Sequence, residues 1–559
     1  MIRKVRRGKL VADFAPISEE MVVDAIKNAK ASTAAGPNEV TMVHLKHFGG
    51  RAIRFLTHLF NLSVRHAEMP AIWKKAVIVP VPKPGKPADV STSYRPISLL
   101  APASKILERC LLSFFKESPS QHGFRSDHST TTALLPLASR IADGFNQQKS
   151  PLRTATVAID ISKAFERVDH TLLLDAIAST NLHPNLIRWS AAYLRGRQSR
   201  VSWQGVDSGW RIVRTGVLQG SVLGPIFFNF FISDCPTDQP SYADDFTFSR
   251  SAVHVEDLER RLQQDLDRVC SWVDRKKLVI APAKCSVTFF TPDKAREANI
   301  HPKIHVNGEI IPLEKNPKIL GVTFDPHAHY HAHVQRKVKE GHQKLRILRS
   351  LAGASWGCSK ETLTRTYKSH VESSLFYASA VWGPNISTSS VNQLQRIVNA
   401  AARVITGCHS STPVNDLVME AQILPAENRV DMLSQQSLVS ALRPNHLSHT
   451  VVTAPSGPRS KKNTLQSKHI AAVSPLLSNG TTDPATYRAT LKTIHTDSVS
   501  RVVDDPNFSF SRVLGGNRPA ISPSESSLSR AERSTLAQLR SGNCRQRSRA
   551  NSSTLIFVV

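Results

Sequence analysis

The sequence predicts an α+β fold made of several units. Its 559 residues are more than one domain usually holds, and they suggest two to four units. Apolar residues recur at helical spacing in some segments and in short β-rich runs in others, so helices and strands are mixed along the chain. A hydrophobic fraction of 40% with 21% charged residues allows a packed core and excludes global disorder.

The charge balance indicates a polyanionic partner. Lys and Arg number 72 against 44 Asp and Glu, which gives a net charge of +28. Phosphate groups attract such a surplus and release counterions when they are neutralised. The sequence has no run of eighteen apolar residues, so we expect no membrane-spanning helix, and the basic first ten residues lead into no apolar segment typical of a secretory signal. Seven scattered cysteines without CxxC spacing are typical of reduced intracellular thiols.

The N-terminal part predicts two helices and a strand. The first helix is expected over 16–30, with Ser18 at its cap and acidic residues in its first turn. The second is expected over 50–67, where apolar residues recur at helical spacing. Residues 75–82 alternate like an exposed strand with prolines at its edge, and a basic, turn-rich stretch follows over 83–93.

The rest of the chain alternates helices with short strands and then becomes polar. Helices are expected over 131–145, 170–194, 253–278, 360–382 and 389–406, and strands over 156–159, 199–203, 286–290 and 317–324. Gly407 closes the last of these helices. Beyond about residue 440, Ser, Thr, Pro, Asn and Arg predominate, and we expect much of that region to be loosely ordered.

Three carboxylates are the candidates for chemistry. Asp160 ends the β-rich run VAID, and Asp244 with Asp245 lie in SYADDFTF, which predicts the tip of a hairpin. If the two elements are neighbours, the carboxylates repel one another unless hard cations lie between them. Oxygen-rich sites suit Mg²⁺, and two such ions would clamp the attacking and leaving oxygens of a phosphoryl transfer. Taken singly, an Asp-Asp turn is usually solvated and a strand-ending Asp is usually a helix cap.

Two further features accompany the acids. The segment GVLQGSVLGP at 216–225 has glycines that let the backbone approach a flat ligand, although a plain turn before a core helix is the alternative. Lys83 in VPKPGKP and Arg95 in SYRPISLL offer two cations that can hold a triphosphate. Ordinary surface charge is the alternative for each of them.

Seven segments, in order, resemble the reverse transcriptases of non-LTR (LINE-like) retrotransposons. They are PKPGK, YRPISLL, QHGFRSDHST, VAIDISKAFERVDH, GVLQGSVLGP, SYADD and LGVTFD, and the resemblance covers roughly residues 16–410. It implies a right-hand polymerase with fingers, palm and helical thumb. The expected parts are an N-terminal extension with fingers (1–130), a palm with part of the fingers (131–300), a primer grip with the thumb (301–440) and a basic, partly disordered C-terminal region (441–559).

The resemblance also implies roles for individual residues. Asp160, Asp244 and Asp245 match the catalytic, metal-binding acids of the palm, with the Ile161 carbonyl as a further ligand. Lys284 falls near the lysine proposed to protonate the leaving pyrophosphate. The nucleotide-binding positions are matched by Lys83, Arg95, Phe165, Gln219 and Gly220. Phe165 stands where the family excludes a ribose 2′-hydroxyl, and residues 320–325 match the primer grip.

The function that the resemblance implies is RNA-directed DNA polymerisation. Two Mg²⁺ ions are the expected cofactors, with Mn²⁺ as a substitute. The expected partners are an RNA template, a DNA primer or target and dNTPs, without a membrane, and the expected location is intracellular, in the nucleus. The implied biological process is target-primed reverse transcription of an element RNA.

The chain also departs from the family. The link SDCPTDQPS before Tyr242 and the segment before Gln121 are short, and Asn38 and Glu39 stand where the family usually has Asp-Gly. No endonuclease precedes residue 1 and no ribonuclease H is evident, so we expect a truncated or partly degenerate copy. A catalytically inactive nucleic-acid-binding relic is therefore the alternative function. A group II intron type of reverse transcriptase is a further alternative, although the spacer at 85–93 and the segment LAQLRSG favour the LINE-like type.

A run of alternating histidines, DPHAHYHAH, follows the primer-grip segment. In an extended strand, His327, His329, His331 and His333 would share one face. Because no carboxylate or Cys completes a metal-binding spacing, we expect a solvated or nucleic-acid-facing loop.

Overall fold

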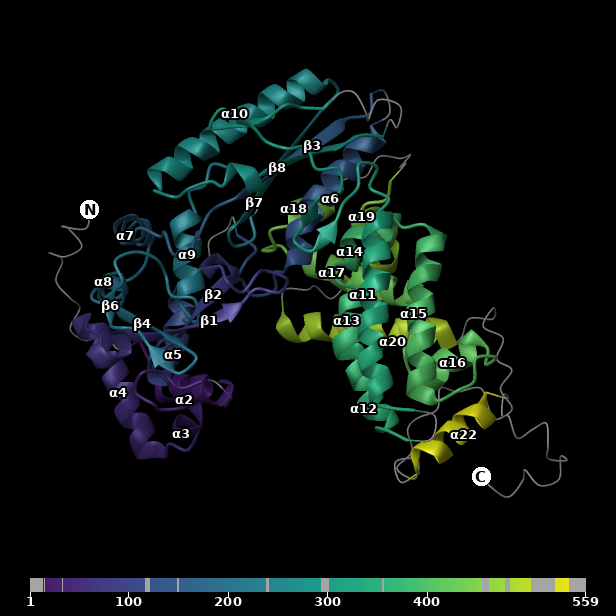
Figure 1. The fold of residues 1–559 in the computed structure, drawn as a ribbon, viewed down its shortest axis with the longest axis horizontal. Helices are drawn as coiled ribbons and strands as arrows, with labels where there is room; N and C mark the ends of the chain where they lie inside the picture. The colour runs from purple at the N-terminus through teal and green to yellow at the C-terminus, as the bar shows by residue number, and fades with distance from the viewer. Residues whose placement is uncertain are drawn as a thin grey trace.

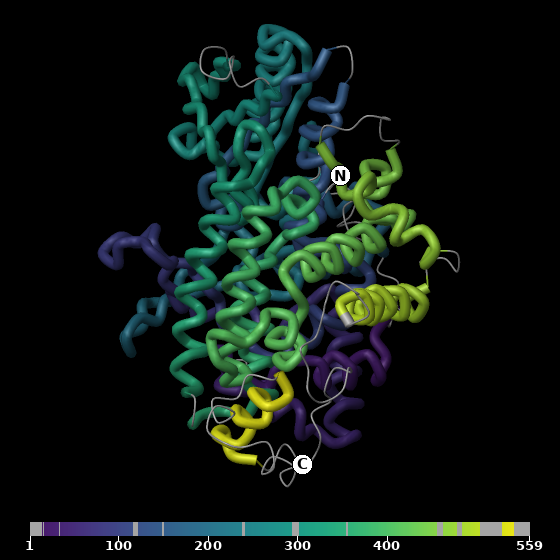
Figure 2. Tube along the Cα trace, turned by 90° about the vertical axis from the view of Figure 1, so that its right-hand side faces the viewer, coloured from purple at the N-terminus to yellow at the C-terminus, as the bar shows by residue number. Residues whose placement is uncertain are grey.

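The structure is a computed structural model, and it describes residues 14, 16–32, 34–115, 121–147, 150–237, 241–292, 301–353, 356–454, 462–477, 483–503 and 528–541. Figure 1 shows an arch in which an N-terminal lobe and a C-terminal helical lobe stand on either side, below a three-stranded sheet and its helices. Figure 2 views the C-terminal lobe face on, with α22 at its lower end.

The N-terminal lobe combines helices with a small mixed sheet. Its helices include α2 (Glu19–Lys27), α3 (Met42–Lys46), α4 (Gly50–His66), α5 (Pro102–Leu111), α7 (His170–Ala178) and α8 (Pro184–Leu194). Its strands are β1 (Lys75–Pro82), β2 (Tyr94–Leu99), β4 (Gln198–Trp203), β5 (Val206–Asp207) and β6 (Arg211–Ile212). Strand β1 pairs antiparallel with β2 and parallel with β4. The predicted cap of the first helix is confirmed, because the Ser18 side chain accepts a hydrogen bond from the Met21 N–H.

The central sheet carries the candidate acids. Its order is β7 (Asp245–Ala252), β3 (Arg153–Asp160), β8 (Ser286–Phe290), and both pairings are antiparallel. Ala155, Val157 and Ile159 alternate along β3 and lie in one apolar core with the long helix α10 (Val255–Arg275). The other residues of β3 face the opposite side, which is polar; Thr154 and Thr156 are buried there. Asp160 continues this polar face at the end of the strand.

Two more helices flank this sheet. Helix α6 (Thr130–Asn146) packs against β3 and β7, and Arg140 on it donates to the Ser249 carbonyl (2.9 Å). Helix α9 (Gly224–Ile232) is wholly apolar apart from Asn229 and is buried in the core, where it packs against α7.

The C-terminal lobe is almost entirely helical. Two short hairpins precede it: β9 (His305–Val306) with β10 (Glu309–Ile310), and β11 (Lys318–Ile319) with β12 (Val322–Thr323). The helices are α11 (His331–Ser350), α12 (Lys360–Thr366), α13 (Ser373–Leu375), α14 (Ser379–Trp382), α15 (Thr388–Thr406), α16 (Val414–Ala421), α17 (Ala426–Ala441), α18 (His449–Thr453), α19 (Leu465–Val473), α20 (Pro484–Val503) and α22 (Arg530–Arg540). As predicted, Gly407 ends α15, in the left-handed conformation (φ +74°). In the described part of the chain, no helix is long and apolar enough to cross a membrane.

Three expectations from the sequence are wrong. The single helix expected over 170–194 is two helices, because α7 ends at Ala178 and a new helix starts at Pro184. Proline suits a helix start, since it lacks an N–H and the first turn of a helix does not use one. The helix expected over 360–382 is interrupted by a π-helical turn at Tyr367–Glu372. The single strand expected over 317–324 is a hairpin, because β11 turns back after Ile319 and pairs antiparallel with β12.

The described part of the region beyond 440 contains helices, in which spaced apolar residues such as Leu465, Val473 and Ile494 are buried in the core of the lobe. The expected loose order of much of that region stays a prediction. The rest of that region lies outside the described residues.

Candidate active site

Asp160 and Asp245 lie directly opposite each other on neighbouring strands. Asp160 is the last residue of β3, Asp245 is the first of β7, and the antiparallel register pairs them. Their side chains therefore point to the same face, the polar one. Asp244 precedes Asp245 in the turn that starts β7, so the three acids meet at one edge of the sheet.

The surroundings of Asp244 and Asp245 raise the pKa of both carboxyls. Asp244 and Asp245 reach the solvent, but densely packed protein surrounds them and raises the pKa of both carboxyls. The pKa of Asp245 rises to about 6, first through this loss of hydration and then through the negative charges of Asp244 and Asp160. The edge thus carries crowded negative charge that a cation would relieve.

Lys284 provides one such positive charge. Its Nζ lies 3.4 Å from Asp160 Oδ1, and it is placed there by a short 3-10 turn, Pro282–Lys284, next to β8. Both side chains are substantially exposed, so this ion pair adds little to stability. The structure therefore brings Lys284 to the acids, and its role there stays a prediction.

The donor set fits a hard cation by its chemistry. Within the described ranges, no three His, Cys, Asp or Glu side chains stand close enough together to hold a metal ion as they are. The three carboxylates nevertheless offer only oxygen ligands, which Mg²⁺ prefers, and the negative charges of Asp160 and Asp244 add to the burial that raises the pKa of Asp245. Ile161 follows Asp160 directly and is buried, with a bridge to Ile280 that fixes its backbone.

Gln121 braces the acidic turn, and sequence reasoning did not single it out. Its side chain is buried, and Oε1 accepts hydrogen bonds from the N–H groups of Ala243 (2.9 Å) and Gly123 (2.8 Å). Its Nε2 donates to the Ala243 carbonyl and to Ser241 Oγ, both at 3.2 Å. Ala243 has φ +54°, a conformation that only local support holds for a residue with a Cβ. The signal in the sequence that could have identified Gln121 is the motif QHGFR, because its first residue holds a turn some 120 positions away.

The third position of the same motif, Gly123, requires a glycine. A Cβ there would lie 2.6 Å from the Ala243 N atom, so only glycine lets the two backbones approach this closely. The predicted hairpin tip is a tight turn, since Tyr242 and Asp245 form an isolated bridge across it and Asp245 begins β7. Among the described residues before the turn, Ser241 forms a bridge with Gln121.

The glycine-rich segment packs against both the Asp160 strand end and the N-terminal sheet. Val217 donates from its N–H to the Phe165 carbonyl (2.9 Å), and the Gln219 carbonyl accepts from the Ser98 N–H on β2 (2.7 Å). A Cβ at Gly220, where φ is +112°, would lie 2.7 Å from the Ser98 oxygen. Phe165 stacks on Phe228 of α9, with ring centroids 4.2 Å apart, and stays partly exposed. The loop thus joins the acids to β2.

Glu108 holds this loop in place and was also missed. The side chain is fully buried, and Oε2 accepts from the N–H groups of Val222 (2.8 Å) and Leu223 (3.0 Å), next to the start of α9. Burial is the main cause that raises the pKa of this carboxyl. No spacing in the sequence connects residue 108 with residue 222, so only the fold shows this contact.

Lys83 and Arg95 lie at the same end of one hairpin, on either side of the loop that joins β1 to β2. Arg95 on β2 pairs with Val81 on β1, and the Lys83 N–H donates to the Ser93 carbonyl (2.8 Å). Arg95 is exposed, whereas Lys83 Nζ donates to the Thr92 carbonyl (2.9 Å). The connection between this pair and the acids is indirect. Ser98 on β2 donates to Gln219 in the glycine-rich loop, and Val217 of that loop donates to Phe165, five residues after Asp160.

The histidine run does not form the expected solvated loop. His331 and His333 start α11, and His333 is fully buried, where its Nδ1 accepts from the Thr323 N–H (3.1 Å). Burial lowers the pKa of His333 to about 3. The His329 ring lies 3.1 Å from Lys462 Nζ, so the run is part of the packing of the C-terminal lobe.

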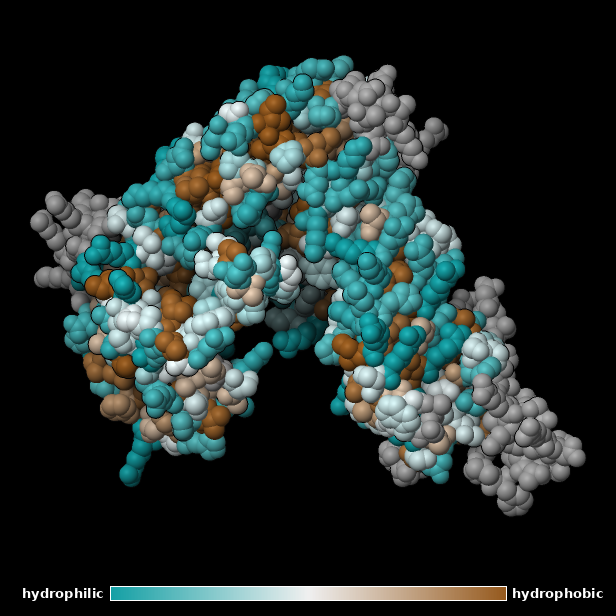
Figure 3. All heavy atoms as spheres, viewed as in Figure 1, coloured by the Kyte–Doolittle hydropathy of each residue, from teal (hydrophilic) through white to brown (hydrophobic). Residues whose placement is uncertain are grey.

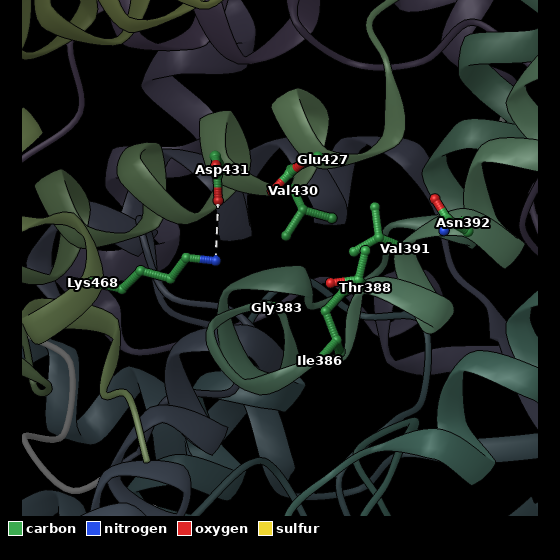
Figure 4. Close-up of a pocket in the computed structure, with 9 residues that line it drawn as sticks. All are labelled: Gly383, Ile386, Thr388, Val391, Asn392, Glu427, Val430, Asp431 and Lys468. Carbon is green, nitrogen blue, oxygen red and sulfur yellow. Dashed lines mark ion pairs between the residues drawn. The ribbon is translucent and has the colours of Figure 1, made fainter. Parts of the chain in front are cut away.

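A small cavity in the C-terminal lobe lies apart from this edge. It has a volume of about 120 Å³, and Lys468 and Asp431 form an ion pair of 3.5 Å in its wall (Figure 4). Typical ligand pockets measure about 300–1,000 Å³. The acidic edge, rather than this cavity, is the candidate site.

The fold and the acidic edge fit the class of α+β polymerases. Residues 81–324 match the family model described as reverse transcriptase (RNA-dependent DNA polymerase). The chain therefore contains a reverse transcriptase domain, and its resemblance to the polymerases of non-LTR retrotransposons is confirmed.

Curated relatives carry matching names. The chain is 29% identical over 415 residues to a protein of Drosophila melanogaster named probable RNA-directed DNA polymerase from transposon BS. The aligned segment covers 70% of this chain and 45% of the relative. It is 27% identical over 413 residues to the RNA-directed DNA polymerase from mobile element jockey of Drosophila funebris, with 70% and 44% covered. A polyprotein from type-1 retrotransposable element R2 of Nasonia vitripennis is 24% identical over 349 residues, with 58% and 32% covered. The chain thus spans less than half the length of each of these relatives.

Proposed function

We propose that this chain is an RNA-directed DNA polymerase of a non-LTR retrotransposon. The observation that carries the proposal is the convergence of Asp160, Asp244 and Asp245 at one sheet edge inside a reverse transcriptase domain. In the reaction, the 3′-oxygen of a DNA primer attacks the α-phosphorus of a dNTP opposite an RNA template. The bond from the α-phosphorus to the bridging oxygen breaks, and pyrophosphate leaves.

The three acids and the Ile161 carbonyl are the oxygen ligands that would hold two Mg²⁺ ions. When bound, such ions supply Lewis-acid activation of the primer hydroxyl and neutralise the leaving pyrophosphate. Lys284 lies at the same edge and would give its proton to the pyrophosphate oxygen as the bond breaks, which its 3.4 Å ion pair with Asp160 supports. Its ion pair with Asp160 would orient the ammonium group toward the acidic edge.

The remaining predicted residues would bind the nucleotide. Lys83 and Arg95 would hold the triphosphate, Lys as a point charge and Arg as a planar fork. Phe165 would close the space that a 2′-hydroxyl needs. Gln219 and Gly220 would lie beside the templating base pair, which the close packing of this loop on β2 supports.

The three parts of the arch would then act as fingers, palm and thumb. The N-terminal lobe, including α7, α8 and β4, would be the fingers, the sheet with the acids the palm, and the helical lobe the thumb. Figure 3 shows the hollow between the two lobes, below the sheet. With a net charge of +28, the chain would hold the template–primer duplex there through phosphate contacts. Nuclear localisation stays a prediction from the resemblance.

Primer extension tests the proposal. The purified chain, incubated with poly(rA)/oligo(dT), dTTP and Mg²⁺, is expected to lengthen the primer, and chelation of the metal with EDTA is expected to stop it. A chain that retains the template–primer on a native gel but adds no nucleotide with Mg²⁺ or Mn²⁺ would instead be the inactive nucleic-acid-binding relic.

A further inference from the structure

The tip of the β11–β12 hairpin has an unusual backbone. Ile319 pairs with Val322, so Leu320 and Gly321 form a two-residue turn, and both have positive φ (+44° and +86°). Turns of this type favour Asn or Gly at both places, and a leucine rarely adopts this conformation. The tip therefore depends on contacts from outside the hairpin.

The C-terminal lobe supplies these contacts to the backbone of the hairpin. Tyr377, between α13 and α14, donates its hydroxyl proton to the Leu320 carbonyl (2.9 Å). Arg336 on α11 donates to the Gly321 carbonyl (2.5 Å). The Tyr377 ring also packs directly on the tip, since a Cβ at Gly321 would lie 2.9 Å from its Cε1.

The same hydroxyl of Tyr377 bonds to the other side of the site. Its oxygen lies 2.6 Å from Thr130 Oγ1. A phenol has one proton, and Tyr377 gives it to Leu320, so Thr130 is the donor in this second hydrogen bond. Thr130 is the first residue of α6 and follows the segment in which Gln121 braces the acidic turn.

The two hydrogen bonds of the Tyr377 hydroxyl therefore join separate parts of the chain. One phenol hydroxyl thus connects the hairpin tip, the start of α6 and, through the segment 121–130, the turn that holds Asp244 and Asp245.

We propose that Tyr377 is a positioning residue that fixes the hairpin tip at 320–321 relative to the acidic turn at 242–245. A primer strand that lies against the hairpin would then present its 3′ end to the carboxylates at a constant distance. The inference rests on the polymerase function proposed above, and it assigns to Tyr377 a role in alignment rather than in binding. Its loss should lower the rate of the chemical step, which is sensitive to small misplacements, more than it lowers affinity for template–primer.

The test uses Tyr377→Phe, which keeps the ring on Gly321 and removes both hydrogen bonds of the hydroxyl. We expect kcat for dTTP addition on poly(rA)/oligo(dT) to fall by at least about tenfold, with the Kd for template–primer changed by less than about twofold. Thr130→Val removes one of the two hydrogen bonds and should lower kcat by a smaller factor. Thr130→Ser keeps the hydroxyl and should retain the wild-type kcat. Tyr487→Phe on α20 is the matched control and should leave both quantities unchanged.

A second readout does not require catalysis. A primer with 2-aminopurine at its 3′ end reports the stacking of the terminal base, and Tyr377→Phe should change its fluorescence in the bound complex. Unchanged kcat and unchanged fluorescence in the folded variant would overturn the inference. If the wild-type chain extends no primer, the polymerase function fails, while the fluorescence change still decides the positioning role. If Tyr377→Phe does not fold, Thr130→Val decides in both assays.

Discussion

Asp160 and Asp245 are paired across β3 and β7, and this pairing sets the position of the acidic site. Side chains alternate along a strand, so a slip of one residue in this register would move one of the two carboxylates to the apolar face under α10. The long apolar alternation of β3 against α10 makes such a slip costly. The core of the sheet thus fixes the relative position of two charges that repel each other.

The brace formed by Gln121 should be needed for catalysis. Gln121→Leu leaves the N–H and carbonyl of Ala243 without their partner, at a cost of roughly 1–3 kcal/mol for each buried group. We expect the rate of primer extension to fall by more than tenfold, because the turn with Asp244 loses its support. Gln147→Leu, at an exposed position after α6, is the matched control. Equal extension rates for the two variants would show that the turn keeps its shape without the brace.

Phe165 should determine which sugar the site accepts. Phe165→Val is expected to raise the ratio of rNTP to dNTP incorporation, because a smaller side chain leaves space for the 2′-hydroxyl. If Phe165 is only a core residue that stacks on Phe228, the change costs on the order of 1–3 kcal/mol of stability and leaves the ratio unchanged. Phe289→Val, which removes the same volume from the buried face of β8, controls for that loss. An unchanged ratio in a folded, active Phe165→Val chain rejects the role.

Buried histidines should make the fold sensitive to mild acid. Burial lowers the pKa of His122 and of His333 to about 3, and that of His446 to about 4, from an ordinary value of 6.5. Below pH 6.5 the unfolded chain takes up protons that the folded chain refuses, so these groups lower the free energy of unfolding as the pH falls from 6.5 toward 4. Above pH 6.5 they have no effect.

Urea denaturation at pH 7.5, 6.5 and 5.0 measures this dependence. Each histidine that stays neutral in the fold should cost about 2 kcal/mol at pH 5 relative to pH 7.5. His122→Gln should reduce the difference. A midpoint that is the same at pH 5.0 and 7.5 would contradict the burial of neutral imidazoles.

Local patterns in the sequence were sufficient for most helices and strands. The run VAID and the spacing in 253–278 correctly predicted β3 and α10, because each has a strong period and a buried face. The break at residues 179–183 was missed because apolar residues continue across it, and only Pro184 marks the new start. The helices beyond 440 were missed because their few apolar anchors lie among Ser and Thr.

The site was predicted less completely than the fold. The motifs named the acids and Lys284, which the structure brings together, and their catalytic roles stay predictions. Gln121 and Glu108 could not be assigned, since each acts on a backbone more than 100 positions away and local sequence carries no sign of that contact. Their partners are defined only by the fold.

Binding to nucleic acid should depend strongly on salt and little on sequence. The charge of +28 predicts several phosphate contacts, and each contributes about −0.7 to −0.9 to the slope of log affinity against log salt. Fluorescence anisotropy with a labelled RNA–DNA duplex at 50–200 mM KCl measures that slope. A flat slope, or a large difference between two unrelated duplexes, would contradict the electrostatic account.

The most direct test of the central claim compares extension by the wild-type chain, Asp160→Asn and Asp245→Asn. Removing one carboxylate charge weakens the hold on the metal but not the basic surface. We expect both variants to add dTTP to poly(rA)/oligo(dT) only at the background rate, with template–primer affinity nearly unchanged. Asp257→Asn, at an exposed position in the first turn of α10, should extend like the wild type. Extension by Asp160→Asn or Asp245→Asn at the wild-type rate would contradict the assignment of the acidic edge as the polymerase site.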